Sequence, residues 1–229
     1  MIGLQNKTLL IYGAGGLGRE IYDLAQRCND GRWKQIWFLD DSCESRHPFY
    51  GTEVFSLNEA LSAYPLSDLE GIVAVGEPVV REKLYVRLRQ LGVAIATLID
   101  KTALISPYAT VGEGSVVSEF VTLHSGVTIG ENCLLQPYSC LGHDIILEDH
   151  VVLSAFCAPG GKSHFGTRSF VGMHATILQG LTVGKDAIIS MGSVVFRDVS
   201  IGATVMGNPA RETRGNAEHR VFKDQGEKR

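Results

Sequence analysis

A six-residue hydrophobic period runs through the second half of the chain and restricts what that half can fold into. From Ile105 to Ile201 every sixth residue is aliphatic or aromatic, except Pro159. No insertion interrupts the period. The position four residues later, from Ala109 to Val205, holds only Ala, Ser, Val, Cys, Ile or Leu. Such hexads predict a parallel β-helix, in which three hexads close one triangular coil. Chance alternation in a β-sandwich would not keep this phase over seventeen positions.

Composition and charge narrow the class of protein further. The 229 residues, 45% hydrophobic and 20% charged, fit a soluble globular protein of one large or two small domains. A net charge of −4 disfavours a nucleic-acid partner, and no apolar run is long enough to span a bilayer. The first residues show no basic segment, apolar core and cleavage site, so we expect no signal peptide. Five scattered cysteines support neither a disulfide framework nor a zinc site. We therefore expect a cytoplasmic protein without membrane insertion or a bound metal.

The first hundred residues have the pattern of a small parallel α/β domain of about four strands. Gly13, Gly15 and Gly18 form a GxGxxG motif between a strand and a helix, and Asp40 follows at the end of the next strand. Backbone amides at such a helix start favour a phosphate. Only half of a doubly wound fold precedes the repeat, so a mononucleotide-type ligand fits better than a dinucleotide. The alternative is a tight turn that merely lets helix pack on strand. The expected strands and helices cover residues 8–12, 19–28, 35–41, 71–76, 79–92 and 94–99.

His143 and Asp144 interrupt the aliphatic rhythm as the third and fourth residues of their hexad, where side chains avoid the interior. Residues eighteen apart stack on neighbouring coils, which places Gly161 beside His143 and leaves a ledge without a side chain. A neutral imidazole can take a proton from an attacking amine, and an adjacent carboxylate can orient it and raise its basicity. The pair therefore predicts a general base. The alternative is an exposed polar pair on a solenoid face.

Several motifs, taken together, resemble one family. The sequences "GAGGLGRE", "FLDD", "VAVGEP", "LIDKTALISPYATVGEG" and "VMGNPAR" are similar to those of the sugar N- and O-acyltransferases. These include bacterial UDP-4-amino-sugar N-acetyltransferases and sialic acid O-acetyltransferases, and the resemblance runs from residue 8 to about 211. It implies a Rossmann-like α/β half domain over residues 1–100 that binds a nucleotide-sugar. A left-handed β-helix over residues 101–211 would follow, and then a polar C-terminal tail over residues 212–229.

The same resemblance implies an activity and a site. The expected reaction is acetyl-CoA-dependent N-acetylation of a nucleotide-linked amino sugar, with UDP as the expected nucleotide, by a homotrimer whose active sites lie between subunits. His143 would be the base and Asp144 its partner. Contacts to the nucleotide-sugar would fall on Gly15, Gly16, Leu17, Asp40, Asp41 and Gly76. Contacts to acetyl-CoA would fall on the backbone around Gly161, Met173 and Met191.

The chain departs from the family pattern at one position and leaves alternatives open. Relatives often carry a second histidine nine residues after the first, where this chain has Val152. His150, two residues earlier, could point the same way. Sugar O-acetylation and a non-catalytic trimeric nucleotide-sugar binder both remain open. A zinc hydratase built on His124, His164 and His174 is disfavoured, because their spacings do not match.

Overall fold

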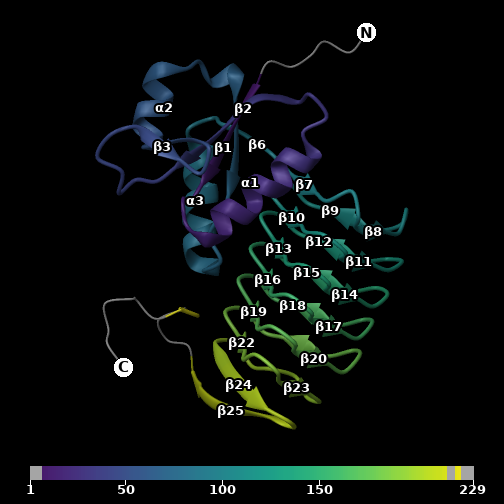
Figure 1. The fold of residues 1–229 in the computed structure, drawn as a ribbon. Coiled ribbons are helices and arrows are strands. Elements are labelled where there is room, and N and C mark those ends of the chain that lie inside the picture. Colours follow the sequence, from purple (N-terminus) through teal and green to yellow (C-terminus); the bar gives the residue numbers. More distant parts are fainter. Residues whose placement is uncertain (1–6, 216–219, 223–229) are drawn as a thin grey trace.

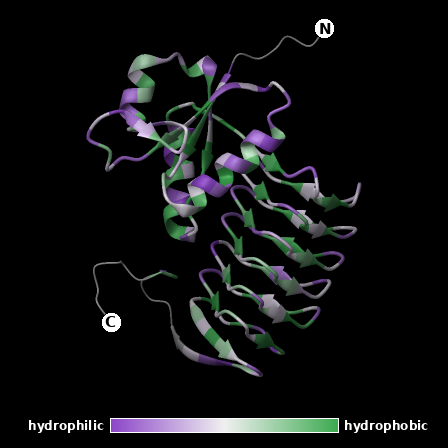
Figure 2. Cartoon of the chain, in the orientation of Figure 1, coloured by the Kyte–Doolittle hydropathy of each residue, from purple (hydrophilic) through white to green (hydrophobic). Residues whose placement is uncertain are grey.

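The computed structural model describes residues 7–215 and 220–222. An α/β domain sits at one end and along one side of a tapering stack of coils, and the chain passes once from the first unit to the second (Figure 1). Hydrophobic residues concentrate on the strands of both units and hydrophilic residues on their loops (Figure 2). In this described part of the chain, no helix combines the length and apolar character needed to cross a membrane.

The N-terminal domain is built on a six-stranded sheet in the order β3-β4-β2-β1-β5-β6, parallel except for β3. The sequence predicted only about four strands, because β3 and β4 are short and follow a polar loop with little alternation. The expected strand at 94–99 divides in two, and its second half already belongs to the β-helix. The strands are β1 (Lys7–Tyr12), β2 (Trp33–Leu39), β3 (His47–Phe49), β4 (Thr52–Phe55), β5 (Leu69–Val73) and β6 (Ala94–Ile95).

The helices pack through apolar faces. The helix α1 starts directly after the glycine turn and buries Ile21 and Leu24, while α3 starts with Pro78, a residue suited to a first helical turn. Ser56 caps α2 by accepting a hydrogen bond from the Glu59 backbone N–H. The helices are α1 (Gly16–Cys28), α2 (Leu57–Ala63) and α3 (Pro78–Gln90), with a 3₁₀ turn, η1 (Leu66–Asp68).

The repeat forms the β-helix that its period predicted. Strands mostly two residues long stack in three parallel sheets, and paired residues are eighteen positions apart, as in Val116 with Leu134. Sheet 1 contains β7 (Leu98–Ile99), β10 (Val116–Val117), β13 (Leu134–Leu135), β16 (Val152–Leu153), β19 (Phe170–Val171), β22 (Ile188–Ile189), β24 (Ala203–Gly207) and β25 (Ala210–Gly215).

The other two sheets complete the triangle. Sheet 2 is interrupted beside Pro159, which has no N–H to donate, although backbone bonds from Cys140 and Gly142 still join β14 to β17. Sheet 2 contains β8 (Leu104–Ile105), β11 (Thr122–Leu123), β14 (Cys140–Leu141), β17 (Ala158–Pro159), β20 (Thr176–Ile177) and β23 (Val194–Val195). Sheet 3 contains β9 (Thr110–Val111), β12 (Thr128–Ile129), β15 (Ile146–Leu147), β18 (His164–Phe165) and β21 (Thr182–Val183).

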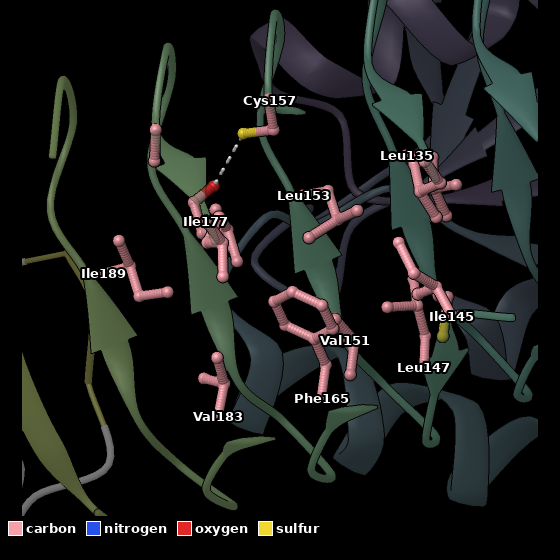
Figure 3. Close-up of a cluster of buried hydrophobic side chains, with 14 of the residues drawn as sticks. Leu135, Ile145, Leu147, Val151, Leu153, Cys157, Phe165, Ile177, Val183 and Ile189 are labelled. Carbon is pink, nitrogen blue, oxygen red and sulfur yellow. Dashed lines mark hydrogen bonds between the residues drawn. The ribbon is translucent and has the colours of Figure 1, made fainter. Parts of the chain in front are cut away.

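The interior of the β-helix is a continuous apolar column, part of which Figure 3 shows with Phe165 among Leu, Ile and Val side chains. Pro159 is buried and fills its place in the column. Cys133 and Cys157 are buried free thiols, and burial raises the pKa of each to about 12, so both stay protonated and pack as small residues.

The last coil corrects the period read from the sequence. Val183 pairs with Val199, and Ile189 pairs with Val205, so this coil has sixteen residues rather than eighteen. Val199, Ala203 and Val205 are buried, whereas Ile201 is 76% exposed. The apolar residue at Ile201 thus matches the hexad phase by coincidence. Two residues are missing from the turn between β23 and Val199.

The two units share a hydrophobic contact. The outward side chains of sheet 1, including Leu134 and Val152, pack against Ile21 and Leu24 of α1. Beside it the Arg81 side chain is fully buried and donates hydrogen bonds to the carbonyl oxygens of Val73, Val75 and Asn132. The α/β domain is thereby held against sheet 1 of the β-helix, on one side of the stack (Figure 1).

Candidate active site

His143 and Asp144 lie at one corner of the β-helix, which we call the histidine corner (turns 125–126, 143–144, 161–162 and 179–180). The second residue of each of these turns has a left-handed backbone, with φ of +57° at Asp144 and +61° at Lys162. Aspartate tolerates this conformation better than branched residues do. The corner geometry therefore accepts an acid directly after the histidine.

The two side chains are joined as the sequence predicted. His143 Nδ1 lies 2.9 Å from Asp144 Oδ2, and the two side chains are 56% and 59% exposed in the single chain. Because a carboxylate only accepts hydrogen bonds, we assign the proton of the neutral ring to Nδ1. Nε2 then carries the lone pair and points away from the acid. This is the arrangement that a general base requires.

Gly161 supports the imidazole ring from the next coil. A Cβ atom placed on Gly161 would lie only 2.8 Å from both Nε2 and Cδ2 of His143. The predicted ledge therefore exists, but the imidazole lies over it. Gly142 and Gly160 in the adjacent column could not carry a side chain either, because a Cβ atom there would meet backbone 2.5–2.6 Å away. Glycine at these positions lets successive coils approach and fixes the ring's position.

A second histidine, His124, lies near the pair, although the sequence predicted no catalytic role for it. His124 precedes the turn one coil earlier, and its Nε2 lies 3.8 Å from the Cys140 thiol. Stepping eighteen residues from His124 leads to Gly142, the neighbour of His143, which is the signal that places it here. Among the residues that the structure describes, no group of three or more His, Cys, Asp or Glu side chains could hold a metal ion.

His150 does not join this corner. It lies buried at a second corner, the helix-facing corner (turns 131–132, 149–150, 167–168 and 185–186), where it meets Asn132 Nδ2 at 3.0 Å and the Tyr85 ring of α3. Burial lowers the pKa of His150. Hence the suggestion that His150 replaces the family's second histidine is wrong. Val152, at that histidine's position, is buried in the contact with α1.

Two glycines of the turn are closely packed against neighbouring backbone, and two others have open space beside them. Gly13 has φ of +125°, and a Cβ atom there would lie 2.7 Å from Ala74 O. One on Gly18 would overlap Gly13 O. These two glycines thus serve helix–strand packing. Gly15 and Gly16 have nothing within 4 Å of a Cβ position, so their backbone at the start of α1 is open to a ligand.

Asp40 and Asp41 face different surroundings. Asp40 lines a cavity of about 370 Å³ with Ala14, Ser42 and residues of the β3–β4 hairpin, and its Oδ1 accepts hydrogen bonds from the Ser42 backbone N–H and hydroxyl. Asp41 is outside this lining, because its carboxylate accepts a hydrogen bond from Tyr12 Oη and pairs with Arg87. Burial, with the Asp41 hydrogen bond, raises the pKa of Tyr12. Of the two carboxylates, only that of Asp40 lines this cavity, and both remain predicted contacts of the nucleotide-sugar.

Met173 and Met191 lie at the third corner, the aromatic corner (turns 119–120, 137–138, 155–156, 173–174 and 191–192). Four rings stack here at centroid distances of 4.8–4.9 Å: Phe120, Tyr138, Phe156 and His174. Met173 also lines a groove of about 470 Å³ with Leu17 of α1. Within one chain, this corner and the histidine corner lie at opposite ends of the sheet 2 strands. The structure therefore does not bring Gly161 together with Met173 or Met191 at one corner of a single chain.

Comparison with known proteins identifies the family of both units. Residues 8–88 match the PglD N-terminal domain, and residues 166–197 match the hexapeptide repeat of succinyl-transferase. The chain is 32% identical to "GDP-perosamine N-acetyltransferase" of Escherichia coli O157:H7 over 216 residues, which cover 88% of this chain and 94% of the relative.

Solved structures agree with the sequence match. The acetyltransferase domain of PglB from Neisseria gonorrhoeae FA1090 superposes with a TM-score of 0.84, at 29% identity, over 91% of this chain and all of that domain, and it has also been solved with acetyl coenzyme A. A mutant of perosamine N-acetyltransferase from Caulobacter crescentus, in complex with CoA and GDP-perosamine, gives a TM-score of 0.84 at 25% identity. That superposition covers 93% of this chain and 98% of the other.

These relatives confirm the expected fold class, including the left-handed sense of the β-helix, and acetyl-CoA as the acyl donor. The chain belongs to the sugar acyltransferases that join a PglD-type N-terminal domain to a left-handed β-helix of hexapeptide repeats, and it is an acyltransferase.

Proposed function

We propose that the enzyme transfers the acetyl group of acetyl-CoA to the amine of a GDP-linked amino sugar, with His143 as general base. The observation that carries this proposal is the His143–Asp144 pair, whose 2.9 Å hydrogen bond leaves Nε2 as an exposed base held over Gly161. A non-catalytic binding protein would need neither the pair nor the glycine beneath it.

In the proposed reaction the sugar amine attacks the thioester carbonyl carbon. The amine's lone pair forms the C–N bond, and its proton passes to His143 Nε2. The C–S bond then breaks, and the proton passes from the imidazolium to the leaving sulfur, so that CoA leaves as its thiol. Asp144 accepts the Nδ1 hydrogen bond throughout and stabilises the imidazolium while it exists.

The N-terminal domain and the relatives support the choice of nucleotide in this proposal. The diphosphate would lie on the open backbone of Gly15 and Gly16 at the start of α1, where N–H groups and the helix dipole favour an anion. Asp40 lines the adjacent cavity, and a carboxylate can accept two hydrogen bonds from the N1–H and N2–H groups of guanine. The relative of 32% identity is named for a GDP-sugar. We therefore propose GDP, in place of the UDP expected from the sequence.

The active site would lie between subunits of a homotrimer. His143 and Gly161 occupy the histidine corner, whereas Met173, Met191 and the groove that reaches Leu17 occupy the aromatic corner. Since the acyl donor is expected to contact both corners, the histidine corner of one subunit would face the aromatic corner of the next.

The proposed reaction can be tested directly. Purified enzyme would be incubated with acetyl-CoA and either GDP-perosamine or a UDP-linked 4-amino sugar, with mass spectrometry of the sugar product and a thiol-reactive dye for released CoA. We expect the GDP-sugar to gain one acetyl group on nitrogen, with equal release of CoA thiol. Acetylation of the UDP-sugar alone would refute the nucleotide assignment. Acetylation of neither substrate would refute the proposed function.

A further inference from the structure

A short C-terminal segment, Arg220–Phe222, returns to the N-terminal domain beside the glycine turn. The Val221 backbone N–H donates to both carboxylate oxygens of Glu77, at 2.9 and 3.1 Å, and the Phe222 N–H donates to one of them at 3.0 Å. Glu77 is the residue directly before α3. Hydrogen bonds to a charged acceptor are stronger than those between neutral groups. The segment is thereby anchored at the carboxyl end of β5.

The Phe222 ring lies over Gly76. A Cβ atom on Gly76 would lie 3.6 Å from Phe222 Cε2 and 3.9 Å from Leu17 Cδ2. The ring also makes an edge-to-face contact with Phe170 of the β-helix, with centroids 5.6 Å apart and planes at 84°. The side chain nevertheless remains 54% exposed. It is an anchored aromatic ring with a free surface.

This free surface adjoins the backbone that we assign to the diphosphate. Gly76 and Leu17 are both predicted contacts of the nucleotide-sugar, while the Gly15–Gly16 backbone between Leu17 and the Asp40 cavity is open. Gly76 follows β5 and Asp40 follows β2, and these two strands flank β1 on opposite sides. Phe222 thus stands across the glycine turn from the Asp40 cavity, where the sugar of a bound nucleotide-sugar would lie. The two family matches, residues 8–88 and 166–197, do not reach it.

We propose that Phe222 forms the wall of the sugar subsite and packs against the C–H groups of the amino sugar, which makes it a specificity-determining residue. This inference rests on the proposed function, because the sugar is placed by the diphosphate on Gly15 and Gly16. It replaces the predicted direct contact of the sugar with Gly76 by a contact with the ring that covers that glycine.

The test compares the intact enzyme with Phe222→Ala, in binding and in turnover. We expect the Kd and the KM for GDP-perosamine to rise about tenfold, as for loss of one aromatic contact. The Kd for GDP, the KM for acetyl-CoA and the kcat at saturation should each stay within about twofold. Phe222→Trp should restore sugar affinity, because it keeps an aromatic wall. Leu66→Ala, at a 44% exposed position on η1, is the matched control and should change none of these constants.

Three results would overturn the inference. Unchanged affinity of Phe222→Ala for GDP-perosamine would mean that the ring does not meet the sugar. Tighter binding would mean that the ring obstructs the site. Equal weakening for GDP and GDP-perosamine would place the ring at the nucleotide. In all three cases the unaltered enzyme still binds and acetylates the sugar, whereas failure of that enzyme itself to bind or acetylate it would refute the proposed function and this inference with it.

Discussion

Asp144 is the second residue of its turn at the histidine corner. In each of the four turns of this corner, from residue 125 to 180, the second residue has a left-handed backbone conformation. The others are Gly126, Lys162 and Gly180, with φ between +61° and +75°. The left-handed turn brings the Asp144 carboxylate over Gly126, which has no Cβ to obstruct it. The left-handed turn, which recurs in each coil, therefore places the Asp144 carboxylate beside the His143 imidazole. Gly126 on the coil before and Gly161 on the coil after leave room for the two side chains.

Removing the imidazole should remove most of the chemistry. We expect His143→Ala to lower kcat by about 10²–10⁴, the usual worth of a positioned general base, with a small change in KM. Asp144→Asn should cost less, because it keeps the imidazole and removes only its charged partner. Steady-state kinetics of both variants would check this order. Full turnover by His143→Ala would show that the pair is an exposed polar pair without a catalytic role.

The glycine beneath the imidazole offers a subtler change. A methyl group on Gly161 would fall 2.8 Å from the ring, so Gly161→Ala should displace His143 without removing it. We expect kcat to fall by about 10-fold or more, because a shift of about 1 Å at a catalytic group is costly. The thermal midpoint, measured beside that of His143→Ala, serves as control. A variant that loses the fold, or one that keeps full kcat, would contradict the positioning role.

At the scale of elements, α3 and the helix-facing corner share a half-buried polar contact. Arg168 bridges Asp186 at 2.6 Å and Glu82 of α3 at 2.6 Å. His150 is 7% exposed beside Glu82 and Arg81. Desolvation is the main cause of its lowered pKa and outweighs the opposing carboxylates of Glu82 and Asp149.

This histidine should make folding sensitive to acid. Because the pKa of His150 is lower in the folded state, the unfolded chain binds more protons below about pH 6.5. The free energy of unfolding should therefore fall as the pH drops through this value toward the folded pKa. His150→Gln should weaken that dependence, whereas His47→Gln, at an exposed position, should not. Urea unfolding at fixed protein concentration between about pH 5 and 8 checks this. An unaltered acid limb in His150→Gln would contradict it.

The elements also show which features a sequence can predict. The hexad period predicted the β-helix because each interior position demands an apolar or small residue in every coil. The same period wrongly placed Ile201 in the interior, because the shortened turn before it changes the phase of the repeat while apolar residues continue. The hairpin β3–β4 has too few residues to show alternation. Coil geometry predicted that the side chains of His143 and Asp144 lie together at a corner. The contacts of Asp41 with Tyr12 and Arg87 come from distant elements and have no local sequence signal. Phe222 lies 145 residues from Glu77, a contact for which the sequence gives no local signal.

For the whole molecule, we predict a homotrimer, as the family resemblance implies, with each site shared between the two kinds of corner. Each chain has a mass of 24.9 kDa, so light scattering at working concentration should give about 75 kDa. Addition of acetyl-CoA should not change this value. A mass of one chain would contradict the proposed sharing of the site between corners.

A mixing experiment tests whether the site is shared. Asp40 and His143 would serve the same substrate from different subunits, so Asp40→Ala and His143→Ala should each be nearly inactive alone. Trimers formed at random from equal amounts of the two should regain about a quarter of the wild-type activity, because each subunit junction has that chance of joining two intact halves. No recovery after verified subunit exchange would place both residues in one chain's site.

The hairpin of β24 and β25 ends the stack of coils, and its last strand, β25, runs antiparallel to the strand beside it. The strands of the three sheets run parallel from coil to coil, but β25 pairs antiparallel with β24. A bare final coil would present parallel backbone to solvent, and the first coil of another molecule could extend it into a filament. With β25 in place, the last strand of sheet 1 runs the wrong way for such growth. Chains would associate through their sides, where their corners can meet, and not through their ends.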